Sequence, residues 1–506
     1  MAYNKGTKGK TFATQQGLNS YIKNVCDIMR RSNCAGALQY VPELSWILFL
    51  KILDDTEQRE AEEAEAVGDI FQDSISEPYR WRDWAAPNGT HRLKLQMGQM
   101  GQFIPFINDE VIPYLKQLKD PKKNPTPRQK IISEVMSNIE RVRIDTEANF
   151  LDILDKVHEM DYIDPTHIFP ISQVYEGLLL KMGEKNNDGG QFFTPREVVR
   201  AMIKAIDPQV GEKIYDPCCG TGGFLAQSYE YIRDSLKDQI TPEDLDTLKL
   251  KTFYGREKEN LIYPIALANL VLHGIDRPHI WHGNTLNGEE TYGELFKGAP
   301  ELFDIILTNP PFGGKEHKTV QAQFAYKTSA TQVLFLQHVI NNLANGGRCA
   351  IVLDEGVLFR TNENAFVQTK RKLLNDCDLW CIVSLPPGTF IAAGGGVKAN
   401  ILFFTKGKPT EQIWYYDLSD IKVTKRKPLT IADFNEFLNL LPSRGDSERS
   451  WTVTREEIEA KNFDLKAVNP NAKFEEDAET PQELLDFIEL KGQEVAAALS
   501  ILRQWE

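Results

Sequence analysis

A short motif, Asn309-Pro310-Pro311-Phe312, combines residue types that could bind a planar amine. Two successive prolines fix the backbone and remove two N–H donors, so the backbone carbonyls remain as acceptors. The Asn309 side-chain oxygen and the Pro310 carbonyl can accept the two N–H bonds of an exocyclic amine, while Phe312 stacks on the ring. The motif follows an apolar run, Phe303–Thr308, that predicts a strand. We therefore interpret it as a substrate loop at the end of a strand.

A glycine-rich turn, Asp216 through Phe224, forms a second candidate site. Its glycines permit a tight turn and a close approach of a ligand to the backbone. The turn lacks the Gly-Lys-Ser/Thr ending of a phosphate loop, and the Asp216 carboxylate would repel a pyrophosphate. A glycine-rich turn can also serve packing alone. If the turn binds a ligand, a cationic or neutral nucleoside fits better than a phosphate.

Glu257 ends the next predicted strand, Thr252–Glu257, and could accept both hydroxyls of a ribose. Its distance from Gly223 exceeds the usual interval of about 20 residues, and we attribute the excess to an insertion, Lys237–Lys249. An isolated glutamate is more often a surface residue. Its position after the glycine-rich turn makes the ribose interpretation equally reasonable.

These motifs lie in a region where strand-like and helix-like patterns alternate after Pro170, which predicts a mostly parallel sheet with helices on both faces. Ligands of such sheets bind beyond the carboxyl ends of the strands, where the motifs fall. The predicted strands are Lys213–Asp216, Thr252–Glu257, Phe303–Thr308, Arg348–Leu353, Leu379–Ser384 and Asn400–Thr405, and the predicted helices lie near Gly223–Leu236, Asn260–His273, Thr331–Ala344 and Asn364–Leu374.

Helical periodicity dominates both ends of the chain. Apolar residues recur at three- and four-residue steps from Leu18 to Asp161, which predicts a helical N-terminal domain. The segment Thr480–Glu506 predicts a separate helix that packs either on its own domain or on a partner. We expect the acidic run Glu57–Glu65 and the Pro/Lys-rich stretch Lys119–Lys130, interpreted as a loop between helices, to be exposed surface.

Composition restricts the class of protein. The chain has 506 residues with 58 Lys+Arg and 72 Asp+Glu, a formal net charge of -14, so two or three domains are expected. No stretch approaches the roughly 18 apolar residues of a membrane span, and no export signal is evident, which indicates a cytoplasmic protein with no membrane. The 7 cysteines show no pattern of a disulfide framework or zinc site, so no metal is expected. If the substrate is nucleic acid, another chain must supply much of the binding surface.

The sequence resembles the amino-group DNA methyltransferases and, within them, the modification subunit of type I restriction-modification systems. Asn309 through Phe312 matches the catalytic motif of this family, and Asp216 through Phe224 matches its S-adenosylmethionine loop. Gly190 through Arg196 is similar to the segment that precedes this loop and closes over the cofactor. The order of the three motifs is that of the γ-type N6-adenine enzymes, and the resemblance covers nearly the whole chain.

The resemblance implies a Rossmann-like methyltransferase domain at residues 166–470, preceded by a helical domain at residues 1–165 and followed by a docking tail at residues 471–506. It also implies methyl transfer from S-adenosylmethionine to N6 of an adenine flipped out of double-stranded DNA. The catalytic residues would be Asn309, Pro310, Pro311 and Phe312, and the cofactor-binding residues would be Gln191, Phe192, Phe193, Thr194, Pro195, Arg196, Asp216, Gly220, Thr221, Gly222, Gly223, Glu257 and Asn284.

Three features depart from the simplest pattern or carry less weight. Asn284 stands where relatives commonly have an aspartate that bonds the adenine amine of the cofactor, so its amide oxygen would make a weaker contact. Cys218 and Cys219 are interpreted as buried structural thiols. The basic cluster Lys422, Lys425, Arg426 and Lys427 could contact phosphate, although a solvated loop is the more common explanation.

As the resemblance implies, a separate specificity subunit reads the DNA target, two modification subunits join one specificity subunit, and a restriction motor and nuclease subunit can be added. Two alternatives belong to other classes. Protein-glutamine methyltransferases share an Asn-Pro-Pro-aromatic motif, because a glutamine amide poses the same lone-pair problem. The chain could also be an inactive, cofactor-binding assembly subunit, in which case Asn309 would be dispensable for methylation.

Overall fold

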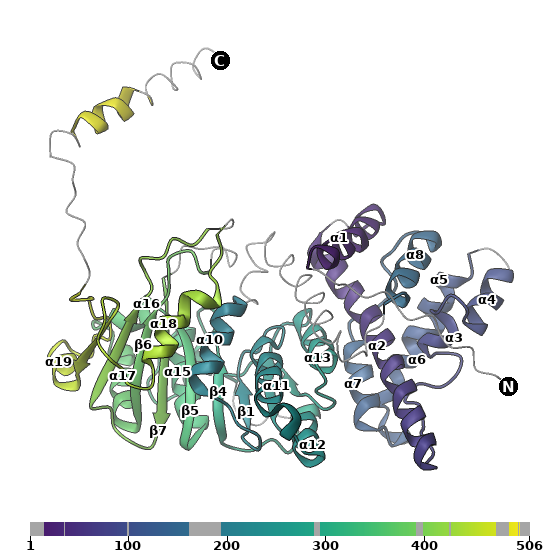
Figure 1. Ribbon diagram of the computed structural model, residues 1–506, viewed down its shortest axis with the longest axis horizontal. Coiled ribbons are helices and arrows are strands. Elements are labelled where there is room, and N and C mark those ends of the chain that lie inside the picture. Colours follow the sequence, from purple (N-terminus) through teal and green to yellow (C-terminus); the bar gives the residue numbers. More distant parts are fainter. Residues whose placement is uncertain are drawn as a thin grey trace.

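A computed structural model describes residues 15–34, 36–98, 101–160, 194–287, 294–390, 398–424, 427–471, 485–493 and 495. A helical N-terminal part lies beside a larger part built on a sheet (Figure 1). A further helix at residues 485–493 lies in the C-terminal segment. The predicted boundary between residues 165 and 166 falls outside the described residues.

The N-terminal part is helical, in line with its apolar periodicity. Its longest helix has a largely buried first half, which packs against neighbouring helices. Thr126 and Gln129 form a capping box at the start of another helix, and Pro127 occupies the first turn, where its missing N–H costs nothing. The helices are α1 (Gln15–Arg31), α2 (Ala37–Val67), α3 (Trp81–Trp84), α4 (Thr90–Met97), α5 (Phe103–Phe106), the π-helix η1 (Ile107–Val111), α6 (Ile112–Lys116), the 3-10 helices η2 (Gln117–Lys119) and η3 (Pro121–Lys123), α7 (Pro127–Val135) and α8 (Glu147–His158).

The larger part contains a nine-stranded sheet in the order β3-β2-β1-β4-β5-β7-β6-β8-β9. Among its described strands, only β7 and β9 run against the others. The strands are β1 (Ile214–Asp216), β2 (Phe253–Glu257), β3 (His279–His282), β4 (Phe303–Thr308), β5 (Leu343–Asp354), β6 (Cys377–Ser384), β7 (Ala399–Lys406), β8 (Gln412–Asp417) and β9 (Ser450–Thr454).

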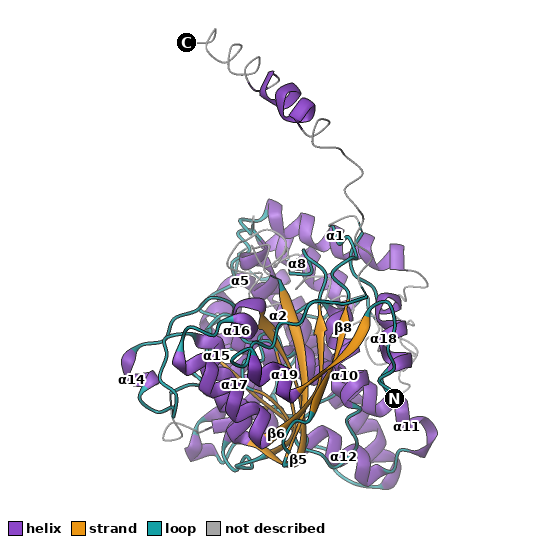
Figure 2. Cartoon of the chain, turned by 90° about the vertical axis from the view of Figure 1, so that its left-hand side faces the viewer, coloured by secondary structure: helices purple, strands orange, loops and turns teal. Residues whose placement is uncertain are grey.

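Helices cover both faces of the sheet, with α10, α11 and α18 on one face and α15 and α17 on the other (Figure 2). The central strands are buried on both faces, as the strands of a parallel sheet require. The helices of this part are α10 (Arg196–Ile206), α11 (Gly223–Leu236), η5 (Lys237–Gln239), α12 (Pro242–Leu250), α13 (Ile262–Leu272), η7 (Glu294–Phe296), α14 (Lys318–Gln321), α15 (Thr331–Asn342), α16 (Glu355–Phe359), α17 (Asn364–Asp376), η9 (Ile431–Phe434), α18 (Asn435–Leu440) and α19 (Arg455–Ala460).

Helix α13 joins the two parts. It is apolar on all sides, and every residue from Ile262 to Leu270 is buried. One side packs on α11, and α2 and α7 of the N-terminal part contact it as well. Asn138 donates a hydrogen bond to the Asn260 carbonyl across the same contact. A helix that is apolar all round needs cover on every side, and the N-terminal part supplies some of that cover.

The predicted mostly parallel sheet with helices on both faces is confirmed. Each predicted strand overlaps an observed one, whereas the sequence analysis does not predict β3, β8 or β9. The predicted loop Lys119–Lys130 contains the last residue of η2, the 3-10 helix η3 and the start of α7. No described helix has the length and apolar character needed to cross a membrane.

The expectation that the acidic run Glu57–Glu65 is entirely exposed is wrong at its first residue. Glu57 is only 2% exposed, and it accepts hydrogen bonds from the Ser74 backbone N–H. Its oxygen also lies 3.5 Å from Arg128, which pairs more closely with Glu60. The arginine comes from α7, so a long-range contact explains the burial of a charge that local sequence places on a solvated face.

Candidate active site

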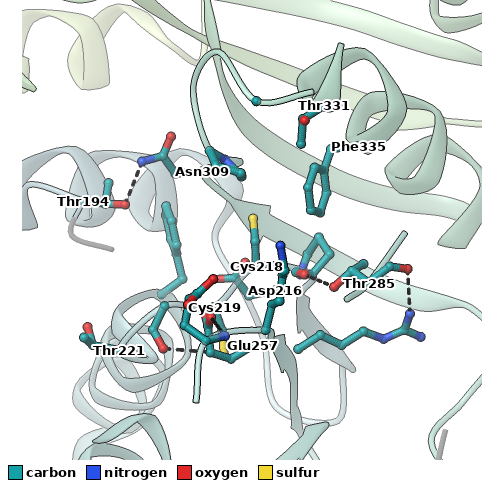
Figure 3. A pocket seen from close by; sticks show the side chains of 18 of the residues that line it. Thr194, Asp216, Cys218, Cys219, Thr221, Glu257, Thr285, Asn309, Thr331 and Phe335 are labelled. Carbon is teal, nitrogen blue, oxygen red and sulfur yellow. Dashed lines mark hydrogen bonds between the residues drawn. The ribbon is translucent and has the colours of Figure 1, made fainter. Parts of the chain in front are cut away.

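A cavity of about 300 Å³ opens at the carboxyl ends of β1, β2 and β4. The glycine-rich turn, Glu257 and Asn309 line it from the sheet side. Thr331 and Phe335, at the start of α15, line it as well (Figure 3). The strand order therefore brings together motifs that lie far apart in the sequence, at the position where sheets of this type bind ligands.

The glycine-rich turn adopts a conformation that needs glycine at two positions. Gly220 has a φ of 53° and Gly222 a φ of 79°, both in the left-handed region. A Cβ atom on Gly222 would also lie 3.1 Å from the Leu270 side chain of α13. The Cys219 N–H donates to the Arg256 carbonyl at 2.9 Å, which holds the turn against β2. The turn leads directly into α11, as the sequence predicts.

Asp216 lies at the end of β1 and is 1% exposed. Its carboxyl accepts a hydrogen bond from the Thr308 hydroxyl at 2.7 Å and another from the Cys218 N–H at 3.1 Å. Burial raises the pKa of this carboxyl to about 7, and the Glu257 carboxyl acts in the same direction, while the two hydrogen bonds oppose the shift. The cavity thus holds a carboxyl group that can be neutral or charged near neutral pH.

Glu257 ends β2 and lines the same cavity. It accepts a hydrogen bond from the Glu259 N–H at 2.7 Å. Burial raises the pKa of its carboxyl to about 7, although hydrogen bonds from backbone N–H groups, including that of Gly220, favour the charged form. The structure therefore places Glu257 in a cavity, rather than on the open surface that was the alternative interpretation.

Asn309 lines the cavity and carries a buried acceptor. Its Nδ2 donates to the Thr194 hydroxyl at 3.1 Å, so its Oδ1 is directed away from that bond (Figure 3). This Oδ1 is buried, and no hydrogen-bond donor reaches it within the described part of the chain. A buried acceptor without a donor costs free energy, typically about 1 to 3 kcal/mol. The arrangement suits a ligand that supplies an N–H.

Pro310 and Phe312 continue the loop. The Pro310 carbonyl accepts a hydrogen bond from Gln332 Nε2 at 3.2 Å, and Gln332 Oε1 accepts one from the Asp354 N–H at 2.9 Å. Gln332 therefore ties the loop to the end of β5, a role that the sequence analysis missed, since nothing local marks this glutamine. Phe312 meets Phe390 edge to face, with 5.2 Å between ring centroids. Pro311 lines the cavity.

Asn284 also lines the cavity, but its side-chain oxygen is already in use. It accepts the Leu286 N–H at 3.0 Å and so stabilises the turn after β3. Thr285 donates to the Pro217 carbonyl, and Arg256 lies 3.5 Å from the Thr285 carbonyl. These bonds connect the turn after β3 to the glycine-rich turn. The Asn284 oxygen would bind a ligand only through its remaining lone pair.

The segment before α10 is described only in part. Gln191, Phe192 and Phe193 lie outside the described residues. Thr194 and Arg196 line the cavity, and Pro195 precedes the first residue of α10. Arg196 Nη1 lies 3.4 Å from the Gly223 carbonyl. Two more of the predicted cofactor-binding residues, Thr221 and Gly223, also line the cavity.

The two cysteines of the turn differ in position. Cys219 is buried, whereas Cys218 is half-buried and its sulfur lies 2.9 Å from the Thr308 hydroxyl. Burial raises the pKa of both thiols, so both are protonated near neutral pH. Among the described residues, no group of His, Cys, Asp and Glu side chains is arranged to hold a metal ion.

Comparisons with known proteins show which families this chain resembles. The N-6 DNA Methylase family matches residues 167–479, and the HsdM N-terminal domain matches residues 18–157. The chain is 35% identical to the EcoEI methylase subunit, of a type I restriction enzyme of Escherichia coli, over 96% of this chain and 97% of that protein. It is 30% identical to the EcoKI methylase subunit of Escherichia coli K12 over 86% of this chain and 79% of that protein.

A solved structure shares the architecture of both parts. The modification subunit attributed to a type I restriction enzyme of Vibrio vulnificus YJ016 superimposes with a TM-score of 0.77 and is 33% identical. The match covers 92% of this chain and 98% of that one. The likeness therefore extends through the helical N-terminal part as well as the sheet.

Proposed function

Because the chain belongs to the N-6 DNA methylase family, we propose that its cavity binds S-adenosylmethionine beside an adenine extruded from double-stranded DNA. The chain would then transfer the methyl group to N6 of that adenine, as the modification subunit of a type I restriction-modification complex. The observation that carries this proposal is the buried Oδ1 of Asn309, an acceptor without a donor among the described residues, on a residue that lines the same cavity as Asp216 and Glu257.

The residues of the cavity fit S-adenosylmethionine. The Asp216 and Glu257 carboxyls are suited to a ligand with a positive charge and with hydroxyl groups, because carboxylates attract cations and accept O–H donors. The glycine-rich turn lets the ligand approach the backbone, and Arg196 and Thr221 complete that wall. The cofactor supplies an electrophilic methyl group on a sulfonium centre. No phosphate-binding arrangement competes with this interpretation in the described turn.

Asn309 and Pro310 would activate the amine. The N6 lone pair of adenine is delocalised into the ring, which makes the nitrogen a poor nucleophile. Acceptance of its two N–H bonds by Asn309 Oδ1 and by the lone pair of the Pro310 carbonyl that Gln332 leaves unused would localise the N6 lone pair toward the donor methyl group. Thr194 holds the amide in the required orientation, and Gln332 holds the carbonyl. Phe312 would replace the base stacking that the extruded adenine loses.

The wider assembly follows from the same proposal. A separate specificity subunit would read the DNA sequence, with two modification subunits for each specificity subunit and a restriction motor and nuclease subunit as an optional addition. The net charge of -14 supports this division, because an acidic chain gains little from DNA phosphates over most of its surface. We retain residues 1–165, 166–470 and 471–506 as the proposed helical, catalytic and docking domains.

Labelled methyl transfer tests the proposed function. The full chain, with and without its specificity subunit, would be incubated with radiolabelled S-adenosylmethionine and unmodified DNA, and the labelled product would be identified after hydrolysis. We expect label in N6-methyladenine, dependent on the specificity subunit. Asn309→Ala should lower the rate by roughly 10² to 10³-fold while cofactor affinity remains, because one acceptor for the transition state is lost.

Other results would contradict the proposal. Label in protein would favour a glutamine methyltransferase. Full activity of Asn309→Ala, or no transfer by the assembled wild-type complex, would favour an assembly subunit without activity.

A further inference from the structure

A long segment with one short helix follows the catalytic loop and takes no part in the proposed function. Residues 313–330, which we name the basic arm, connect Phe312 to the first residue of α15. The arm carries the short helix α14, which stands at the margin of the molecule, outside the helices that cover the sheet (Figure 2). The arm therefore begins next to the substrate loop and ends just before the first residue of α15.

Backbone hydrogen bonds join the first and last residues of the basic arm. The Glu316 N–H donates to the Ser329 carbonyl at 2.8 Å, and the Thr331 N–H donates to the Gly314 carbonyl at 3.2 Å. Lys315 and Ala330 form an antiparallel bridge between these bonds. The two ends of the arm are thus joined to each other at the rim of the cavity.

Side chains fix the rest of the arm to the body of the enzyme. Val320 is buried in a small apolar cluster with Leu286, Leu334 and Phe335, and Phe324 packs against it. Gln337 of α15 makes two hydrogen bonds with the Tyr326 backbone, at 3.0 and 2.9 Å. Since Leu286 belongs to the turn after β3 and Phe335 lines the cavity, the arm is packed directly on the wall of the proposed cofactor site.

The charge of the arm is opposite to that of the whole chain. It contains Lys315, Lys318 and Lys327, all exposed, and Glu316 is its only acidic residue. Glu316 turns inward, where its carboxyl accepts a hydrogen bond from Thr331 at 3.2 Å. Among the described residues, none of the three lysines forms an ion pair. The lysines therefore remain available to an anionic partner.

We propose that Lys315, Lys318 and Lys327 of the basic arm bind backbone phosphates of the duplex beside the extruded base. This inference rests on the proposed function and adds to it the part of the surface that holds the DNA. An enzyme that extrudes a base must hold the flanking backbone, and ammonium groups on a well-anchored segment do so without reading sequence. Lys315 lines the cavity itself, so it would meet the phosphates nearest the target.

A salt titration tests the inference with the full chain assembled with its specificity subunit. The triple variant Lys315→Gln, Lys318→Gln, Lys327→Gln would be compared with wild type for binding to a fluorescent duplex that the complex methylates. Each phosphate contact contributes a slope of about -0.9 to the plot of log affinity against log salt. We expect the slope to become shallower by about 2 to 3, with affinity at low salt reduced roughly tenfold or more.

A matched control carries the same change of charge on the opposite edge of the sheet. Lys251 and Lys297 precede β2 and β4, and Lys408 follows the antiparallel strand β7, so all three exposed lysines lie near the amino ends of the parallel strands. The variant Lys251→Gln, Lys297→Gln, Lys408→Gln should keep the wild-type slope. The control variant should also bind S-adenosylmethionine as the wild type does.

The outcomes separate this inference from the proposed function. If the wild-type complex methylates DNA but the arm variant keeps the wild-type slope and affinity, the arm does not bind phosphate. An equal change of salt slope and affinity in both variants would show that the effect comes from net charge alone, and it would overturn the inference. If the salt slope is unchanged but the arm variant no longer binds the specificity subunit, the lysines bind that subunit instead. If the salt slope is unchanged but affinity for S-adenosylmethionine is lost, the lysines serve the cofactor instead. Failure of the wild-type complex to methylate DNA would count against the proposed function.

Discussion

At the scale of single residues, the site depends on one amide whose N–H group is bonded to a distant hydroxyl. Asn309 donates to Thr194, a partner 115 residues earlier in the sequence. If the amide rotated by half a turn, an N–H group would replace Oδ1 as the group presented to the substrate, and an amine cannot bond to a donor. Thr194 is therefore expected to act as a positioning residue for catalysis.

Replacement of Thr194 by Val tests this expectation. The variant removes the hydroxyl and keeps the shape of the side chain. Loss of one hydrogen bond typically costs about 1.4 kcal/mol, so the rate of methyl transfer should fall roughly tenfold. Single-turnover kinetics would measure the rate, and calorimetry should show unchanged affinity for S-adenosylmethionine. Thr194→Ser retains the hydroxyl and should restore the rate. A Val variant with the wild-type rate would remove this role from Thr194.

Asp216 and Glu257 should make cofactor binding depend on pH. Burial raises the pKa of each carboxyl to about 7. Below that pH the groups are neutral and attract a sulfonium cation weakly, whereas above it they are charged. Affinity for S-adenosylmethionine should therefore rise between about pH 6 and pH 8, with release of protons on binding, as calorimetry in two buffers can measure. An affinity that is constant over this range would contradict the expectation.

The free chain should show the opposite trend in stability. A carboxyl whose pKa is higher in the folded state than in the unfolded state binds additional protons when folded. Its stabilising contribution is present below the unfolded pKa of about 4 and is lost as the pH rises through about 7. Asp216→Asn cannot ionise, so urea unfolding of that variant should depend less on pH over this interval than unfolding of the wild type.

At the scale of elements, the turn between β1 and α11 is shaped by backbone conformation and by contact with α13. Gly222→Ala places a Cβ atom at a φ of 79° and 3.1 Å from Leu270. Gly211→Ala is a matched control, because Gly211 has a φ of +93° and nothing lies within 4 Å of its added Cβ. Both changes should lower the free energy of unfolding by about 1 kcal/mol through backbone strain.

Only the Gly222 variant should also weaken cofactor binding, because the added atom displaces the turn that lines the cavity. Urea unfolding and cofactor titration of the two variants distinguish strain from crowding. Equal cofactor affinity in both variants would show that the contact with Leu270 does not position the turn.

Strands could be predicted from the sequence where their own residues form an apolar run. The run Phe303–Thr308 is apolar, and β4 occupies the same residues. β3 spans only His279–His282 and has a polar histidine at each end, so its local signal is weak. β8 contains an apolar run, Ile413–Tyr416, that could have been identified. β7 lies between β5 and β6 in the sheet, an order that depends on pairing and not on local composition.

At the scale of the whole molecule, the helix at residues 485–493 exposes apolar side chains. Leu485, Phe487, Ile488 and Leu490 are each more than half exposed. Large exposed apolar residues on a helix are stabilised when a partner covers them. We expect the proposed docking tail to contribute this helix to assembly with the specificity subunit.

Removal of residues 480–506 tests the tail. The shortened chain should keep its melting temperature and its cofactor affinity, because the described tail residues lie apart from the sheet (Figure 1). Copurification with a tagged specificity subunit should be lost, and methylation of DNA with it. Normal assembly of the shortened chain would remove the docking role from the tail.

The sequence by itself determined the chemistry that the site can perform, because the asparagine amide, the proline and glycine backbone and the carboxyl groups have the same bonding capacity in any fold. It also determined the sheet class, since alternating strand and helix signals are local. Only the tertiary structure decided that Asn309 donates to Thr194, that Gln332 bonds to the Pro310 carbonyl, and that the partly exposed Arg128 lies beside the buried Glu57. Each of these pairs joins segments far apart along the chain, and such contacts depend on how helices and strands pack rather than on the residues beside them.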